Sequence, residues 1–152
     1  MGSLVHREKL GSPNVELAGL QIWVHSRQFP DSEDYWDGNW LNVSVHCGSK
    51  GASVLVSGSF VRLPELLKWA EACEEMYAKL SGRAELDCME PYLSVEMEME
   101  ELGHVSVIVS ITPDLLAQEH KFSFEIDQSF LPALSQGCRK VLTEYPIRQD
   151  QG

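Results

Sequence analysis

Hydrophobic and polar residues alternate with a period of two along much of this chain, a pattern that predicts β-strands with one buried face. Three such segments come first, at residues 15–29, 39–48 and 52–60. The second and third are joined by the turn sequence GSKG at 48–51. We therefore predict that the chain begins with a meander of antiparallel strands.

Two segments follow a spacing of three to four residues instead, which is typical of amphipathic helices. The first, LPELLKWAEACEEMYAKL, begins at Leu63; Pro64 suits its first turn and Gly82 suits its end. The second, SFLPALSQGCRKVLTEYP, begins at Ser129 and stops at Pro146. We predict an α-helix in each segment.

Four more alternating segments lie between the two predicted helices, at 84–89, 92–101, 104–113 and 120–127. The order of elements predicts an α+β fold. In the simplest arrangement, one mostly antiparallel sheet of about six to seven strands carries both helices on its apolar face. The other face of that sheet is then in contact with solvent.

The length and the composition agree with one domain. The chain has 152 residues, 43% of them hydrophobic and 23% charged, which is ordinary for a globular protein. We predict a single α+β domain over residues 15–146, a disordered lead over 1–14 and a loose tail over 147–152. The chain has no apolar run of about 18 residues and no secretory leader pattern, so we expect neither a membrane span nor secretion.

The charge restricts the partners that the protein can bind. The formal net charge is −11 and the isoelectric point is near 4.8. Nucleic acids and anionic membranes bind cationic surfaces, so we expect neither as a partner. An acidic surface favours a basic protein partner and accelerates its approach, although acidity alone also keeps a protein soluble.

The cysteines do not suggest a disulfide or a metal site. Their spacing contains no C-x-x-C pair, and none stands near a histidine at ligand spacing; they are Cys47, Cys73, Cys88 and Cys138. Free buried thiols are typical of a reducing compartment. We therefore predict a cytoplasmic protein that needs no metal and no other cofactor.

Carboxylates gather on the polar side of two predicted strands. Glu96, Glu98 and Glu100 alternate with apolar residues in segment 92–101, and Glu125 has the same orientation in the last strand. Such charges can prevent sheets from aggregating. They can also form a docking face for a cationic partner, because carboxylates accept hydrogen bonds from arginine and lysine.

The loop DSEDYWDGNW at 31–40 combines carboxylates with aromatic rings. Its spacing does not fit an EF-hand, which needs a ligand where Tyr35 stands and a glycine where Trp36 stands. The chain shows no phosphate-binding loop and no local signature of a catalytic nucleophile. We therefore assign no catalytic residue and predict a protein that is not an enzyme.

Two readings of this loop follow from its residue types. The acids can hold the turn while the rings close the core, or the loop can anchor a basic partner. The candidate partner-binding residues are Asp31, Asp34, Trp36 and Asp37 in the loop and Glu96, Glu98, Glu100 and Glu125 on the sheet. A small-molecule or metal-binding module that uses the loop, and a structural, oligomer-forming domain, are the alternatives; the oligomeric state stays open.

The run FPDSEDYWDGNWLNVSV resembles a signature of the WapI-type immunity proteins, which are small bacterial antitoxins. The residues that match are Phe29, Pro30, Asp34, Tyr35, Trp36, Asp37, Gly38, Asn39, Trp40 and Leu41. The resemblance implies a cytoplasmic protein that neutralises the toxic C-terminal domain of a secreted protein in bacterial competition. In the WapI case the toxin acts on RNA, and the basic character of such nuclease domains agrees with the acidic composition found here.

Overall fold

The computed structural model describes residues 7–149; residues 1–6 of the expected lead and 150–152 of the expected tail lie outside the described residues. The strands are β1 (Val15–Leu17), β2 (Leu20–Arg27), β3 (Trp40–Ser49), β4 (Ala52–Arg62), β5 (Arg83–Asp87), β6 (Leu93–Met99), β7 (His104–Ile111) and β8 (Lys121–Asp127). The helices are α1 (Leu63–Lys79) and α2 (Leu131–Glu144). Short 3-10 turns lie at η1 (Arg7–Lys9), η2 (Glu101–Gly103) and η3 (Gln128–Phe130).

The strands form two antiparallel sheets, in the orders β1-β2-β3-β4 and β5-β6-β7-β8. The α+β class with a mostly antiparallel arrangement is thus confirmed. Eight strands are present rather than six to seven, because the segment 15–29 turns back on itself at Ala18–Gly19 and contributes both β1 and β2. Two sheets replace the single sheet that we expected. Each meander of four strands has one apolar face, and the two meanders bury these faces by packing them against one another.

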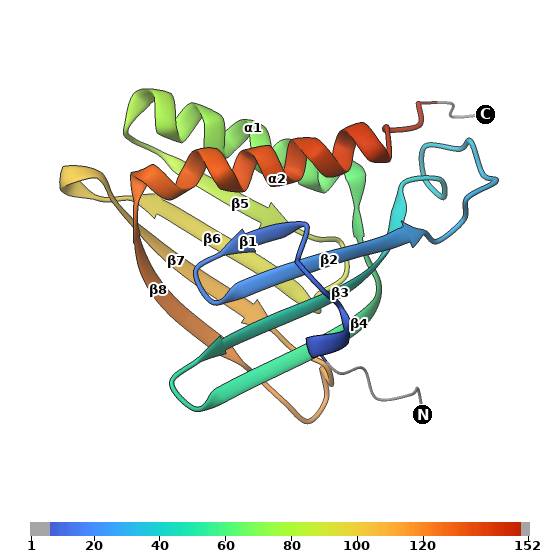
Figure 1. Cartoon of the computed structure of the whole chain (residues 1–152), viewed down its shortest axis with the longest axis horizontal. Coiled ribbons are helices and arrows are strands. Elements are labelled where there is room, and N and C mark those ends of the chain that lie inside the picture. The colour runs from blue at the N-terminus through green and yellow to red at the C-terminus, as the bar shows by residue number, and fades with distance from the viewer. Residues whose placement is uncertain (1–6, 150–152) are drawn as a thin grey trace.

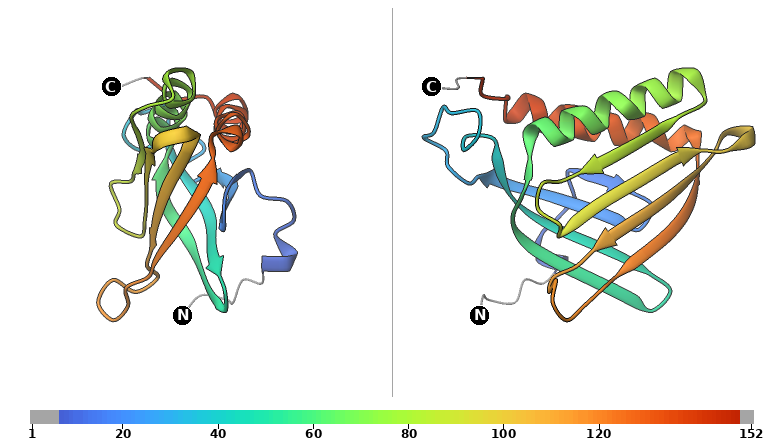
Figure 2. Two further views of the ribbon diagram at one scale, coloured as in Figure 1. Left: turned by 90° about the vertical axis from the view of Figure 1, so that its left-hand side faces the viewer. Right: turned by 180° about the vertical axis from the view of Figure 1, so that it is seen from behind.

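The helices lie side by side and close one side of the space between the two sheets (Figures 1 and 2). Helix α1 packs beside β5, and α2 packs beside β1. The core is built from both sheets and both helices; its largest fully buried side chains are Trp69, Leu20, Ile22, Leu41, Leu63, Leu66, Met76, Leu86, Leu93, Ile111, Leu131 and Leu134. The outer face of the second sheet is left for solvent or a partner, whereas on the outer face of the first sheet Trp23, Ser44 and His46 are buried.

The junction between β4 and α1 is fixed by Glu65 and Arg62, and Arg62 also shapes the loop described below. The backbone N–H of Arg62 donates a hydrogen bond of 2.7 Å to Oε1 of Glu65, and Pro64 occupies the first turn of the helix, as predicted. The helix ends at Lys79 and is capped by Leu80, whose φ of 53° is left-handed. The chain is thereby directed into β5.

The described parts of the terminal segments contact the domain. Asn14 accepts a hydrogen bond of 2.7 Å from the backbone N–H of Val24, and the indole N–H of Trp23 donates to the carbonyl of Gly11 at 2.9 Å. At the other end, the N–H of Arg148 donates to the side chain of Asn39 at 2.9 Å. Among residues 7–149, no helix is long and apolar enough to cross a membrane.

Candidate functional site

The register of the second sheet brings the predicted carboxylates together on its outer face. In β6, Leu93, Val95 and Met97 are buried, so the residues between them point outward. Pairing then places Glu98 between Arg83 and Ser106, and Ser106 beside Glu125. We call this surface the acidic face and define it by Glu85, Glu96, Glu98, Glu100 and Glu125. Glu85, from β5, is a member that we did not predict.

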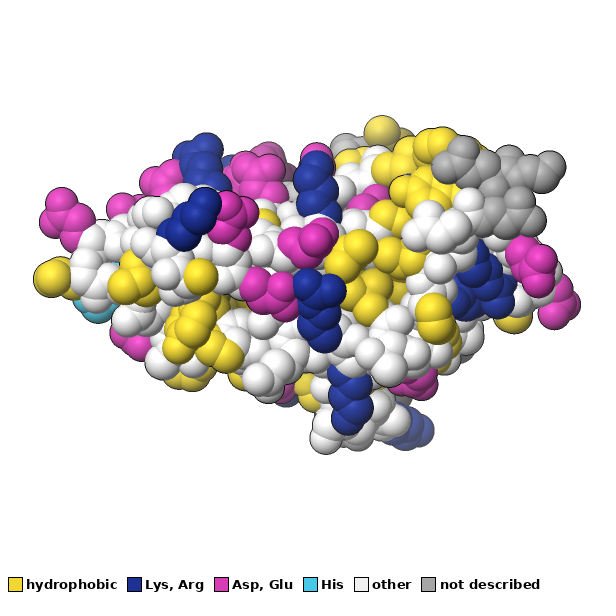
Figure 3. All heavy atoms as spheres, turned by 90° about the horizontal axis from the view of Figure 1, so that it is seen from above, with side chains coloured by type: hydrophobic (Ala, Val, Ile, Leu, Met, Phe, Trp, Pro, Cys, Tyr) yellow, Lys and Arg dark blue, Asp and Glu magenta, His cyan; other side chains and the backbone are white. Residues whose placement is uncertain are grey.

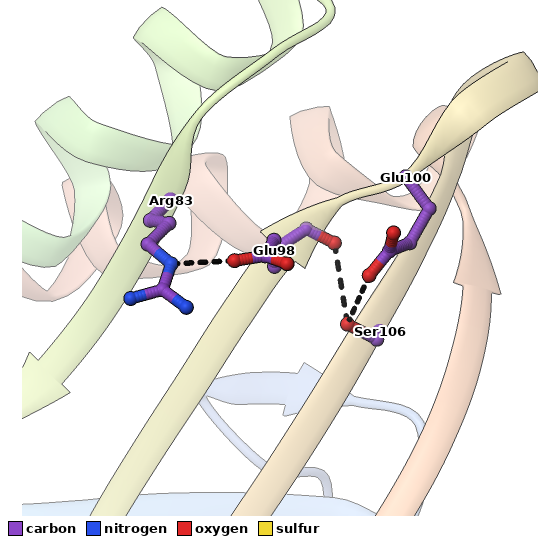
Figure 4. Close-up of polar contacts among 4 residues, drawn as sticks. All are labelled: Arg83, Glu98, Glu100 and Ser106. Carbon is purple, nitrogen blue, oxygen red and sulfur yellow. Dashed lines mark hydrogen bonds and ion pairs between the residues drawn. The ribbon is translucent and has the colours of Figure 1, made fainter.

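One end of the acidic face is held by polar contacts, as Figure 4 shows. Nε of Arg83 lies 2.5 Å from Oε2 of Glu98, and this hydrogen bond raises the pKa of Arg83 above its usual range. The hydroxyl of Ser106 donates to Oε1 of Glu100 at 3.2 Å. Glu100, just beyond the end of β6, is therefore drawn over the neighbouring strand.

The middle of the acidic face leaves two like charges opposite one another. Glu85 and Glu96 are directly paired across β5 and β6, and neither forms an ion pair with any residue between 7 and 149. Like charges at directly opposed positions of a sheet are destabilising. They border an indentation of about 170 Å³ that also contains Ile108. Arg83 lies in the same indentation but is hydrogen-bonded to Glu98, so a cationic partner would supply the ion pairs that Glu85 and Glu96 lack.

The helical side of the molecule has a different charge pattern. Both signs lie next to each other in the view over the helices (Figure 3). Glu74 receives two hydrogen bonds from Arg139, at 2.7 and 2.9 Å, and Glu75 pairs with Lys79 at 2.6 Å. The charges on this side are mixed, whereas carboxylates prevail on the outer face of the second sheet.

The loop after β2 is organised around a buried arginine. The guanidinium of Arg62 lies 5.3 Å from the ring centroid of Tyr35, 5.5 Å from that of Trp36 and 5.6 Å from that of Trp40. It also donates to the carbonyl of Tyr35 at 3.1 Å, and the residue is 5% exposed. We call these four residues the aromatic corner. Its rings already surround a cation that the chain itself supplies.

The carboxylate of Asp34 holds the turn of this loop. Its Oδ2 accepts hydrogen bonds from the backbone N–H groups of Trp36, at 3.1 Å, and Asp37, at 3.0 Å. This is the internal role that aspartate commonly has in turns. Asp31 and Asp37 are exposed, and Trp36 is 57% exposed although its ring faces Arg62. The four loop candidates thus divide into one residue whose carboxylate is engaged by the backbone of the loop and three that remain accessible.

Two further buried polar residues support the loop, and sequence reasoning missed both. Asn39 is fully buried; its amide donates to the carbonyls of Tyr35, at 2.8 Å, and Arg148, at 3.0 Å. Arg27 is 8% exposed and donates to the carbonyls of Gly38, at 2.7 Å, and Pro146. These bonds attach the loop to the segment after α2, which is remote in the sequence.

The cysteines with raised pKa values provide no reactive thiolate at neutral pH. All four cysteines are free, and burial raises the pKa values of Cys47, Cys73 and Cys138 to about 12. At neutral pH these thiols are protonated and weakly nucleophilic. In the part of the chain that the structure describes, no group of three or more His, Cys, Asp or Glu side chains is placed to hold a metal ion.

A comparison with protein families decides how these surfaces are interpreted. The model of the immunity protein WapI-like family matches residues 12–146. The chain belongs to this family. The match covers the aromatic corner and the acidic face alike, and it points to a toxin-neutralising function. No curated protein and no solved structure matches the chain.

Proposed function

We propose that this member of the WapI-like family is a non-enzymatic immunity protein that binds and neutralises a basic toxin domain in the cytoplasm through its acidic face. The proposal rests on Glu85 and Glu96, which lie opposite one another at the centre of that face, neither of them in an ion pair with a residue between 7 and 149. A surface that costs the fold stability and offers acceptors for arginine and lysine is suited to a cationic protein. A nuclease domain is the class of toxin that fits best.

The electrostatics of the whole chain support the same partner. A net charge of −11 attracts a basic domain from a distance, and steering of this kind raises association rates by roughly 10- to 1000-fold. On the acidic face, the approaching cations find carboxylates from adjacent strands. On the helical side they find glutamates already paired with lysine and arginine. The acidic face is therefore the surface that a basic domain selects.

The exposed part of the loop provides a second candidate contact. Asp31, Trp36 and Asp37 remain accessible, whereas Asp34 is engaged by backbone donors. We assign Trp36 the role of an accessory anchor, since tryptophan is enriched at the energetic centres of interfaces. The main role of Trp36 is to form the internal contacts of the aromatic corner.

The first experiment identifies the partner. The polypeptide encoded immediately upstream is the candidate toxin, and its C-terminal domain is tested for co-purification with this chain. The proposal expects a complex with a basic domain whose association slows as salt rises, because salt screens exposed charges. A complex that is indifferent to salt, or no complex with this domain, would overturn the role of the acidic face.

Charge reversal locates the surface within that complex. Glu96→Lys, Glu98→Lys and Glu100→Lys are combined, and a control combines Glu16→Lys, Glu71→Lys and Glu144→Lys, which change the net charge equally at other exposed positions. We expect at least about tenfold slower association for the first variant and a much smaller change for the control. Equal slowing of both would mean that net charge, rather than this face, steers the partner. Circular dichroism checks that both variants fold.

A further inference from the structure

In the part of the chain that the structure describes, strand β4 is an edge strand that lacks the usual protection against pairing with another chain. Edges are commonly protected by charges, by proline or by being short. β4 has 11 residues, and its segment 52–61 contains no charged residue and no proline. The edge strands of the second sheet, β5 and β8, both carry charged side chains, and β1 has three residues and lies beside α2.

The turn before β4 determines which backbone groups are free. Lys50 and Gly51 form a two-residue turn with positive φ values of 37° and 90°, and Ser49 is paired with Ala52. In such a hairpin the flanking pair is hydrogen-bonded and later pairs alternate. Ser53, Leu55 and Ser57 therefore direct their N–H and C=O groups away from β3. Among residues 7–149, none of these groups has a backbone partner beyond the β3 ladder.

The charge around this edge differs from that of the rest of the chain. From Gly38 to Val61 the sequence contains no carboxylate, and Lys50 is the one Lys or Arg in that stretch, although the whole chain has 23 Asp and Glu residues. Two copies of a protein with a net charge of −11 repel one another over most of their surfaces. Strand β4 itself presents no acidic side chain to a second copy and no carboxylate to a basic partner; Glu90 lies beside it only at Val56–Phe60.

We propose that β4 pairs with the β4 strand of a second copy of this chain. The pairing is antiparallel and two-fold, so the same segment serves both copies. It is centred on Leu55, which lies opposite Leu55 of the second copy, and Ser53 lies opposite Ser57. The paired segment ends at Ser57, because a groove of about 370 Å³ beside Val56–Phe60 also contains Glu90. The two β1–β4 sheets then form one continuous sheet.

This pairing is independent of the proposed function. The acidic face belongs to the second sheet, and β4 is an edge of the first, so a pair of copies presents two acidic faces. Salt separates the two kinds of association. Screening weakens attraction to a basic domain, whereas it relieves repulsion between two acidic copies and strengthens their pairing.

The test is the oligomeric state of the full chain, measured by sedimentation velocity over a range of protein and salt concentrations. We expect a reversible dimer that salt strengthens. Leu55→Lys sets two like charges directly opposite one another and should raise the dissociation constant at least about tenfold. Ser123→Lys, at an exposed position on the outer face of the second sheet, adds the same charge and should leave the dimer intact. A monomer under all conditions would overturn the proposal.

Two further variants guard against the possibility that Leu55→Lys disrupts folding rather than pairing. Ser57 is exposed, so Ser57→Lys adds a charge to the same edge without removing apolar packing. Leu55→Pro removes an N–H that points away from β3, a position at which edge strands tolerate proline. Both variants should be folded monomers by circular dichroism and sedimentation. A dimer that survives both substitutions would place the interface elsewhere and refute the β4 pairing.

Discussion

The aromatic corner and the acidic face are both rich in the residues that mark binding surfaces, yet they use them in opposite ways. In the corner, Asp34 accepts two backbone N–H bonds and the rings of Tyr35, Trp36 and Trp40 surround Arg62. On the acidic face, Glu85 and Glu96 oppose one another, and neither forms an ion pair with a residue between 7 and 149, although Arg83 lies in the same indentation. We propose that a recognition surface differs from a structural one in whether its polar groups find their partners inside the molecule.

The aromatic corner and the acidic face also differ in their contributions to the stability of the fold. Each cation–π contact contributes about 0.5–2 kcal/mol, so the corner stabilises the fold. The opposed glutamates cost some stability at the same time. Substitutions in the corner should therefore act mainly on folding, and substitutions on the acidic face should act mainly on association.

The largest effect is expected at the centre of the corner. Arg62→Met removes a buried cation from three rings and a hydrogen bond from the carbonyl of Tyr35. We expect the free energy of unfolding to fall by about 3 kcal/mol. Urea denaturation followed by tryptophan fluorescence measures it. Arg83→Met, on the exposed acidic face, is the control and should change stability little; equal losses would erase the distinction between the regions.

A smaller loss is expected where the loop joins the segment after α2. Asn39→Ala leaves the carbonyls of Tyr35 and Arg148 and the N–H of Arg148 without their partners. We expect a loss of about 2 kcal/mol in the free energy of unfolding, from the same denaturation measurement. Gln136→Ala, at an exposed position on α2, serves as the control. An Asn39→Ala variant as stable as the parent would mean that this junction does not support the corner.

Asp34 separates the turn-holding role from ligand binding. Asp34→Ala should cost about 1 kcal/mol, as the loss of a capping side chain does, and Asp34→Asn should cost less, because its amide oxygen still accepts a bond. Calorimetric titration with divalent metals accompanies the denaturation curves. Metal binding by the parent that Asp34→Asn abolishes without unfolding would favour the alternative of a ligand-binding loop.

The fold and the sites could be predicted from the sequence to different extents. Period-two alternation places Glu96 and Glu98 on one outer face wherever the strand lies, so the acidic face was predictable. Alternation does not predict which element packs against the apolar face of a sheet. We expected helices alone on that face and did not predict a second sheet there. Arg62 and Asn39 are polar residues next to a polar loop; their burial depends on Tyr35, Met89 and Arg148, contacts that arise only from the tertiary fold.

The smallest effect on folding has the opposite sign. Glu96→Lys replaces an opposed pair of like charges with a cross-strand pair of unlike charges, and should stabilise the fold by about 0.5 kcal/mol. The same variant should slow association with the basic domain. Stopped-flow kinetics and denaturation curves on one preparation measure both effects, with Glu71→Lys on α1 as the control. Faster or unchanged association would contradict the assignment of the acidic face.

The most direct test of the central claim is a footprint of the complex. Amide chemical shifts of this chain are compared with and without the C-terminal domain of the upstream polypeptide. We predict changes that concentrate in β5, β6, β7 and β8, around Glu85, Glu96 and Glu98, with at most minor changes near Trp36 and none around Asn39. Changes centred on the loop 31–40, with the second sheet undisturbed, would contradict the account and make the aromatic corner the binding site.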